Sequence, residues 1–257
     1  MWKTIRIAIL LVILGAVALQ QWMDRHTTQS WRETLWVGIF PLNGDGSARA
    51  GEYIARLTPR DFADIETFFA REAHRYGIGL EQPVHVELYP EGHRLPPVLP
   101  RDSGLLGTAW WSLKMRWYAR RASDFRGHPP ARIRLFVLYH DPETYDHLPD
   151  SHGLQKGLMG VVHAFADASL AGSNNLVIAH ELLHTVGASD KYIVTTGEPL
   201  FPIGFADRDQ QPLYPQRQTE IMAGRRPVSP SEWEMPRSLA RVIVGPETAL
   251  EIRWTRP

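Results

Sequence analysis

The chain has 257 residues, of which 44% are hydrophobic, a content that is normal for the core of a soluble protein with one large domain or two small ones. Its 28 basic and 28 acidic side chains give a formal net charge of zero, whereas nucleic-acid-binding proteins usually carry a basic excess, so nucleic acid is not expected as a partner. The chain has no cysteine, which excludes disulfides and thiolate metal sites, so any metal ion must be held by His, Asp, Glu or water.

The first 24 residues have the pattern of a segment that enters a membrane. Lys3 and Arg6 precede an apolar run over 7–19, and polar residues follow. The pattern fits a secretory signal with the small residues 16–18 as its cleavage site. It also fits an uncleaved anchor, which we favour because the run and its weakly polar flanks can span a bilayer. Both alternatives place the remaining domain, 25–257, outside the cytoplasm, which means the periplasm in a Gram-negative cell.

Strand and helix patterns then alternate along the chain. Apolar runs and alternating patterns predict strands over 30–41, 83–89, 131–139 and 161–167. Helical spacing and capping residues predict helices over 58–77, 103–121 and 174–186, a loop over 141–160, and a last helix near 237–244. Prolines between 199 and 236 exclude long regular elements there. This order predicts a single α/β (α+β) domain.

One predicted helix carries a metal-binding pattern. His180 and His184 are four residues apart, so both imidazoles project from one helix face and can reach a single tetrahedral ion. Glu181 points beside that ion, where it can act as a general base toward a water molecule bound there. Gly187 can end the helix and turn the chain back, so that Asp190 offers a third ligand. Three protein ligands and an open position are typical of catalytic rather than structural zinc.

The segment 180–190 resembles the metzincin signature H-E-x-x-H-x-x-G-x-x-H, in the variant with aspartate as the third ligand. The resemblance implies zinc as the cofactor, held by His180, His184 and Asp190. It also implies a zincin or metzincin-like fold: a mostly parallel, twisted sheet with an antiparallel edge strand, an active-site helix and a methionine turn. In this chain, we expect one N-terminal membrane helix to precede the domain with that fold. The strand predicted over 161–167 would then border the substrate cleft.

Met222 is the candidate for the methionine turn beneath the metal, with a glycine two residues later to allow the turn. The chain departs from the family because no tyrosine follows at that position. Tyr192 or Tyr214 could supply a phenol to the transition state instead. If Asp190 is not the third ligand, then Glu198 or Glu220 could be, as in zinc peptidases with a distal glutamate.

Two other features have alternative interpretations. Trp110, Leu113 and Trp117 fall on one face of the helix predicted over 103–121, and we expect them to pack in the core with the basic side chains outside. A membrane surface or an acidic partner is the alternative. The histidines and acids of the loop over 141–160 are expected to form a solvated loop rather than a second metal site. His163 can face either the cleft or the core.

These features together predict a zinc metalloendopeptidase, a hydrolase tethered to the membrane by its N-terminal segment. Glu181 would take a proton from the attacking water and return it to the leaving amine. The expected partners are a peptide or protein substrate and the membrane, and we expect a monomer. One alternative is another zinc hydrolase of the cell envelope, a deacetylase or an amidase. Another is a non-catalytic zinc-binding module, which would not need Glu181.

Overall fold

A computed structural model of the chain describes residues 27–98, 104–125, 127–155 and 157–256, together with Trp2, Arg6 and Gly15. The predicted anchor or signal over 1–24 lies outside the described residues, apart from those last three. Within the part of the chain that is described, no helix combines the length and the apolar character needed to cross a bilayer.

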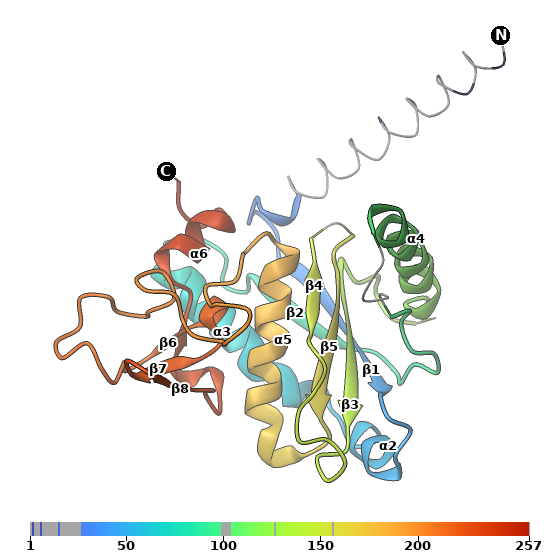
Figure 1. Ribbon diagram of the computed structural model, residues 1–257. Helices are drawn as coiled ribbons and strands as arrows, with labels where there is room; N and C mark the ends of the chain where they lie inside the picture. Colours follow the sequence, from blue (N-terminus) through green and yellow to red (C-terminus); the bar gives the residue numbers. More distant parts are fainter. Residues whose placement is uncertain are drawn as a thin grey trace.

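A five-stranded sheet forms the centre of the fold (Figure 1). In spatial order its strands are β2 (Val84–Leu88), β1 (Leu35–Asn43), β3 (Ile133–His140), β5 (Met159–Phe165) and β4 (His152–Leu154). The first four run parallel, and β4 pairs antiparallel with β5 at the edge. The prediction of a mixed α/β fold with a mostly parallel sheet is therefore confirmed.

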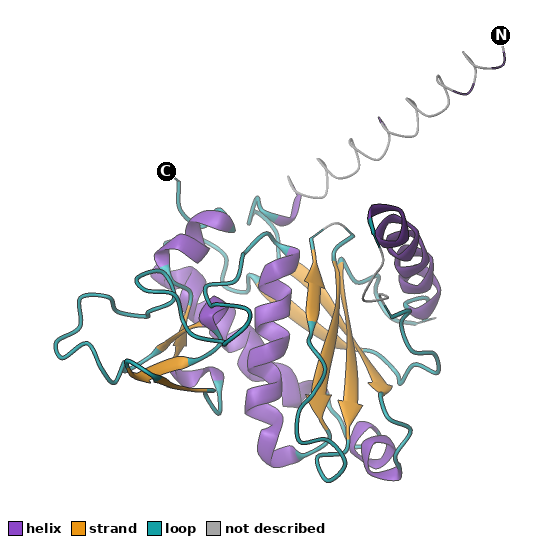
Figure 2. Ribbon diagram, in the orientation of Figure 1, coloured by secondary structure: helices purple, strands orange, loops and turns teal. Residues whose placement is uncertain are grey.

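Helices cover both faces of the sheet, which explains why β1 and β3 are nearly continuous apolar runs (Figure 2). One face packs against α2 (Ala48–Ile54), α3 (Ala63–Arg75) and α5 (Ala171–Thr185). The other face packs against α4 (Leu105–Ala122). Short 3-10 turns, η1 (Pro59–Phe62) and η2 (Ala168–Leu170), lead into α3 and α5. The sequence did not lead us to expect α2.

The edge of the sheet differs from the prediction. We expected the strand over 161–167 to border the cleft, but β4 lies outside it, so β5 is an inner strand. The strand β4 lies within the stretch that we predicted as a loop, because three residues are too few to show a period. Gly153, at its centre, lets the strand approach α5: a Cβ there would lie 2.3 Å from the backbone oxygen of Glu181.

The last helix also differs from the prediction. The stretch near 237–244 forms a 3-10 turn, η4 (Leu239–Arg241), and the strand β9 (Val242–Ile243). The helix α6 (Pro246–Glu251) begins later, at a proline that suits the first helical position. We mistook a short buried apolar run for a helix, and periodicity alone does not separate the two. The elements between α5 and η4 are short: β6 (Thr219–Glu220), which pairs with β9, η3 (Ile221–Ala223), β7 (Arg226–Ser229) and β8 (Glu232–Glu234).

The expected core packing of the α4 tryptophans is wrong. Trp110, Leu113 and Trp117 are 63%, 60% and 56% exposed. The helix packs on the sheet through a different apolar stripe, which includes Met115 and Tyr118. Both stripes have helical spacing, so the sequence pattern does not decide which of them faces the sheet.

The first residues of the continuously described chain, 27–31, pack against its C-terminal end. The Trp31 ring meets Trp254 edge to face, with centroids 5.3 Å apart, and its Nε1 donates a hydrogen bond to the Ile252 carbonyl (2.7 Å). The Gln29 side chain donates to the carbonyl of Val186, the residue that ends α5. These contacts fix residues 27–31 to the folded domain.

Candidate metal centre

The helix α5 lies between the sheet and the C-terminal segment, and most of its side chains are therefore buried. It presents His180 and His184 one turn apart, with their rings edge to face and the centroids 4.7 Å apart. Gly187, with φ 106°, follows the helix and turns the chain back. We predicted this turn because glycine readily adopts a positive φ. The turn brings Asp190 to the two imidazoles.

Three side-chain atoms form a nearly equilateral triangle. The Nε2 atoms of His180 and His184 lie 3.1 Å apart. Oδ1 of Asp190 lies 3.1 Å from the first and 3.2 Å from the second. Ligand atoms around a tetrahedral zinc ion, with bonds of about 2.0 Å, are separated by about 3.3 Å. The triangle therefore has the size that a four-coordinate metal ion requires of three of its ligands.

The outer nitrogens of the two rings fix their tautomers. Nδ1 of His180 lies 2.9 Å from the carbonyl oxygen of Ile221, and Nδ1 of His184 lies 2.9 Å from that of Ala188. A carbonyl oxygen only accepts hydrogen bonds, so each Nδ1 carries the hydrogen and each neutral ring turns a lone pair at Nε2 toward Asp190. With both rings neutral, three electron-rich atoms this close repel one another unless a cation, either a proton or a metal ion, lies between them. Backbone carbonyls orient metal-binding histidines in the same way.

The electrostatics of the triangle also favour a cation. Burial raises the pKa of Asp190, but its contacts with His180 and His184 outweigh that effect, so the pKa is lowered and the carboxylate is ionised. Burial lowers the pKa of His180, but the contact with Asp190 and the charge of Glu181 raise it overall. The site therefore holds negative charge where a metal ion would be held.

Glu181 lies beside the triangle. Its possible ligand atom lies within 4.8 Å of those of His180 and His184, so the three residues are close enough to hold a metal ion. Its Oε2 atom is buried and has no hydrogen-bond partner among the described residues. Burial raises the pKa of Glu181, against the lowering effect of the two histidines and the Gly153 backbone. A buried carboxylate with a free oxygen can accept a proton from a molecule that enters the site.

Of the two tyrosines that we considered, the structure brings Tyr192 to the site. Its ring lies 6.3 Å from the ring of His180, and its hydroxyl interacts with the Asp190 carboxylate. Burial and the nearby carboxylates raise its pKa to about 12, so the phenol keeps its proton. Tyr214 packs instead against Phe205, with ring centroids 5.8 Å apart.

Met222 lies under the site in the buried turn η3, and the neighbouring Ile221 supplies the carbonyl that holds His180. Gly224 closes the turn with φ 68°. Glu220 is fully buried, and its carboxylate accepts hydrogen bonds from two backbone amides and the Thr248 hydroxyl. Glu220 therefore stabilises the turn and does not face the histidines. Among the described residues, the Glu198 side chain makes no hydrogen bond or ion pair with either histidine.

An ion pair between a buried lysine and a half-buried glutamate holds the loop that carries Asp190, and our reading of the sequence missed it. Lys191 is 2% exposed, and its Nζ lies 2.7 Å from a carboxylate oxygen of Glu251 on α6. Ser189 donates two hydrogen bonds to the same carboxylate. These residues flank Asp190 on both sides. No local pattern marks them, because Glu251 is some sixty positions away along the chain.

The described part of the loop over 141–160 forms no second group of His and acidic residues with metal-ligand spacing. His163 turns to a different partner: its Nδ1 lies 2.9 Å from Nε2 of His140 on the neighbouring strand. The histidines that the structure brings together at the candidate metal centre are thus His180 and His184.

No model of a known protein family matches this sequence, and no curated protein matches it. The geometry of the site therefore carries the functional argument.

Proposed function

We propose that the chain is a zinc-dependent endopeptidase with a metzincin-like fold, and that it acts outside the cytoplasmic membrane. The observation that carries the proposal is the triangle of His180, His184 and Asp190, in which a backbone carbonyl orients each imidazole. Two imidazoles and one carboxylate are a usual ligand set of catalytic zinc. The antiparallel β4 outside the parallel β5, and the turn at Met222, support the metzincin-like fold.

When bound, zinc would supply a Lewis acid that polarises a carbonyl and makes water more acidic. Glu181 accepts a proton from the attacking water at its free oxygen, Oε2. The water oxygen forms the new bond to the carbonyl carbon, and the carbon–nitrogen bond breaks. The proton then passes from Glu181 to the leaving amine, so atoms and charge balance. Tyr192, which keeps its proton, donates a hydrogen bond to the carbonyl oxygen as it gains negative charge.

The edge strand β4 favours a peptide as the substrate. It is the last strand of the sheet, so one of its edges is not paired within the sheet. Gly153 holds this strand against Glu181. An extended peptide that adds to this edge brings its own carbonyl groups close to the site, as in other cases of strand addition. A deacetylase or an amidase has no need of such an edge.

Metal analysis and activity on full-length protein test the proposal. Wild type is expected to hold about one zinc ion per chain, and His184→Ala to lose it. Glu181→Gln is expected to keep zinc and to lose peptide hydrolysis by roughly 100-fold or more. Wild type that purifies without zinc and takes up none contradicts the metal site. Glu181→Gln with full activity contradicts the mechanism, and hydrolysis of acetyl groups or side-chain amides but not peptides favours the other hydrolases.

The identity of the third ligand has a separate test. Asp190→Asn keeps the shape of the side chain but removes its charge, so zinc affinity is expected to fall by about 10–100-fold. Glu198→Gln is the matched control and is expected to change nothing. Competition with a chelator measures both. If Glu198→Gln lowers the zinc affinity and Asp190→Asn does not, Glu198 is the third ligand.

A further inference from the structure

The outer face of α4 exposes three large apolar side chains, which we call the tryptophan stripe: Trp110, Leu113 and Trp117. They follow one another by three and four positions, so they lie along one face of the helix. The opposite face packs on the sheet. Large apolar side chains that gather on one exposed face are typical of contact with something outside the fold.

The helix α4 is also strongly basic. It carries four cations and no acid, namely Lys114, Arg116, Arg120 and Arg121. The guanidinium of Arg121 lies over the Trp117 ring, 4.4 Å from its centroid. Tryptophan beside lysine and arginine is the composition of helices that lie in the interfacial layer of anionic membranes.

The position of α4 in the fold fits a membrane surface. Figure 1 shows α4 and residues 27–34, where the N-terminal segment joins the domain, toward the same end of the molecule. The stretch between the apolar run 7–19 and residue 27 reaches at most roughly 25 Å when fully extended. A domain tethered through that run is therefore held with this end close to the bilayer.

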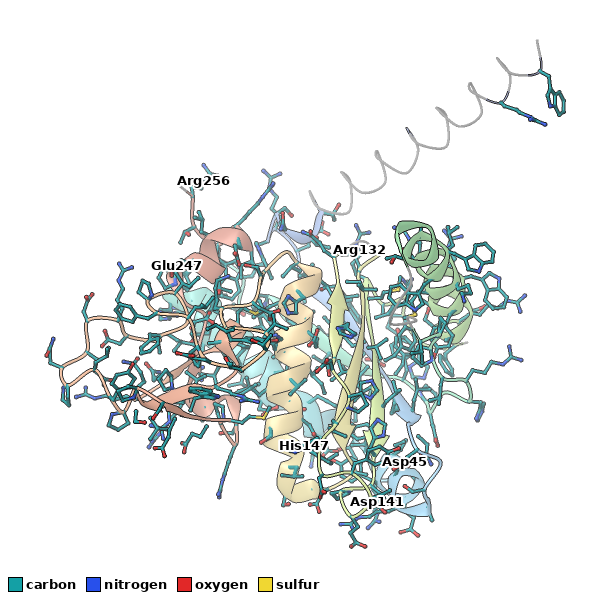
Figure 3. The ribbon with its side chains drawn as sticks, in the orientation of Figure 1. Asp45, Arg132, Asp141, His147, Glu247 and Arg256 are labelled. Atoms are coloured by element: carbon teal, nitrogen blue, oxygen red, sulfur yellow. The ribbon has the colours of Figure 1, made fainter. Side chains whose placement is uncertain are left out.

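A cavity of about 530 Å³ at the same junction is lined by Arg32, Arg253 and Arg256, together with Gln29 and Ser30. Figure 3 shows Arg256 toward this end of the molecule, with Glu247 of α6 below it, and Asp45 and Asp141 at the opposite end. The exposed cations beside the junction match the negative charge of phospholipid head groups.

We propose that the tryptophan stripe of α4 enters the interfacial layer of an anionic phospholipid bilayer, while the basic side chains of α4 and the arginine-lined cavity contact lipid phosphates. The inference rests on the membrane anchor predicted over 1–24 and on the location outside the cytoplasmic membrane given in the proposed function. A second copy of the chain fits this face less well, because a two-fold interface would bring the four cations of α4 against the same four cations.

The absence of cysteine makes a site-specific test possible. Leu113→Cys is labelled with the fluorophore NBD in the full-length chain, which is reconstituted into vesicles that contain nitroxide-labelled lipids, because nitroxides quench NBD. The vesicles are of phosphatidylcholine alone or with phosphatidylglycerol added. Glu52→Cys on α2 is the control, because its side chain is 71% exposed and α2 lies at the opposite end in Figure 1. We expect several-fold stronger quenching at position 113 than at position 52, and more in the anionic vesicles.

A charge-reversal variant, Lys114→Glu with Arg120→Glu and Arg121→Glu, is expected to remove most of the quenching at position 113 while its circular dichroism stays that of wild type. A second variant, Trp110→Gln with Trp117→Gln, is expected to do the same and covers the case in which the first does not fold.

The outcomes separate the inference from the tether. If chains float with the vesicles but the label at position 113 is quenched no more strongly than the label at position 52, the inference is overturned and the tether is not. Chains that do not float overturn both. The inference is also overturned if, in detergent, the label at position 113 is shielded from water because the chain self-associates or binds an acidic protein there.

Discussion

His163 shows how the environment of one residue sets its protonation. It lies against His140, and burial together with the charges of His140 and His152 lowers its pKa to about 4, although Asp150 acts in the opposite direction. In an unfolded chain an imidazole titrates near 6.5. The unfolded state therefore binds more protons between about pH 6.5 and about pH 4, and the free energy of unfolding falls as the pH falls through this window.

We expect His163→Gln to reduce this dependence. The amide of glutamine can still bond to His140 but does not titrate, so the melting temperature should fall less between about pH 7 and about pH 5 than in wild type. Calorimetry of both proteins in the presence of a chelator separates this effect from loss of metal at low pH. Equal slopes in the two proteins would show that His163 is not held neutral.

At the scale of the element, β4 and α5 approach each other closely at the site. A Cβ on Gly153 would lie 2.3 Å from the Glu181 backbone oxygen and 2.7 Å from Cβ of His184. Both neighbours belong to the helix that carries the motif, so neither can move without displacing it. The position of β4 therefore depends on this glycine.

Gly153→Ala is expected to lower the free energy of unfolding by about 1–3 kcal/mol and to weaken zinc binding, because the strand and the helix are forced apart. Gly79→Ala is the control, since a Cβ there meets nothing within 4 Å. Thermal unfolding and chelator competition measure the two effects. Unchanged zinc affinity in Gly153→Ala would mean that β4 does not constrain the site.

The loop of Asp190 is tied to α6 by Lys191 and Glu251. Burial raises the pKa of Glu251, but bonds from Lys191 and Ser189 lower it overall, so the carboxylate stays ionised. Glu251→Gln leaves a buried ammonium without its counter-ion and is expected to cost about 1–3 kcal/mol in the free energy of unfolding. Because the loop is loosened, zinc affinity should fall too.

Glu247→Gln, on the same helix, is the matched control. Glu247 pairs with Arg208 at 3.7 Å, and that arginine is 55% exposed, so its loss is expected to cost less than about 1 kcal/mol. Denaturant unfolding and zinc titration of both variants check the comparison. If Glu251→Gln behaves like Glu247→Gln, the ion pair does not position Asp190.

The sequence predicted those features that depend on neighbouring residues. The spacing of His180 and His184 follows from the geometry of a helix, and Gly187 signals the turn that brings Asp190 back. No local sequence pattern marks the strand β4 or the pairing of Lys191 with Glu251, because both depend on packing between residues that are far apart along the chain. The exposed face of α4 could not be chosen from its period, because the helix has two apolar stripes.

At the scale of the whole molecule, the two ends of the described chain stabilise each other. The Trp31 ring is 6% exposed, contacts Trp254 and donates to the Ile252 carbonyl. Trp31→Ala is expected to lower the free energy of unfolding by about 3–5 kcal/mol, because it leaves a cavity between the two ends. Trp36→Ala, at a tryptophan that is 41% exposed, should cost much less. Denaturant unfolding compares them, and equal losses would show that Trp31 does not join the ends.

The contact of Gln29 with Val186 bears on the distance between the candidate metal centre and the membrane. Residue 29 follows the predicted anchor closely, and residue 186 ends the helix that carries both histidines. Within the described residues, no free linker separates the two. With the predicted anchor in place, the centre would stay within a limited distance of the bilayer. The domain would then cut only those bonds that a substrate presents within that distance.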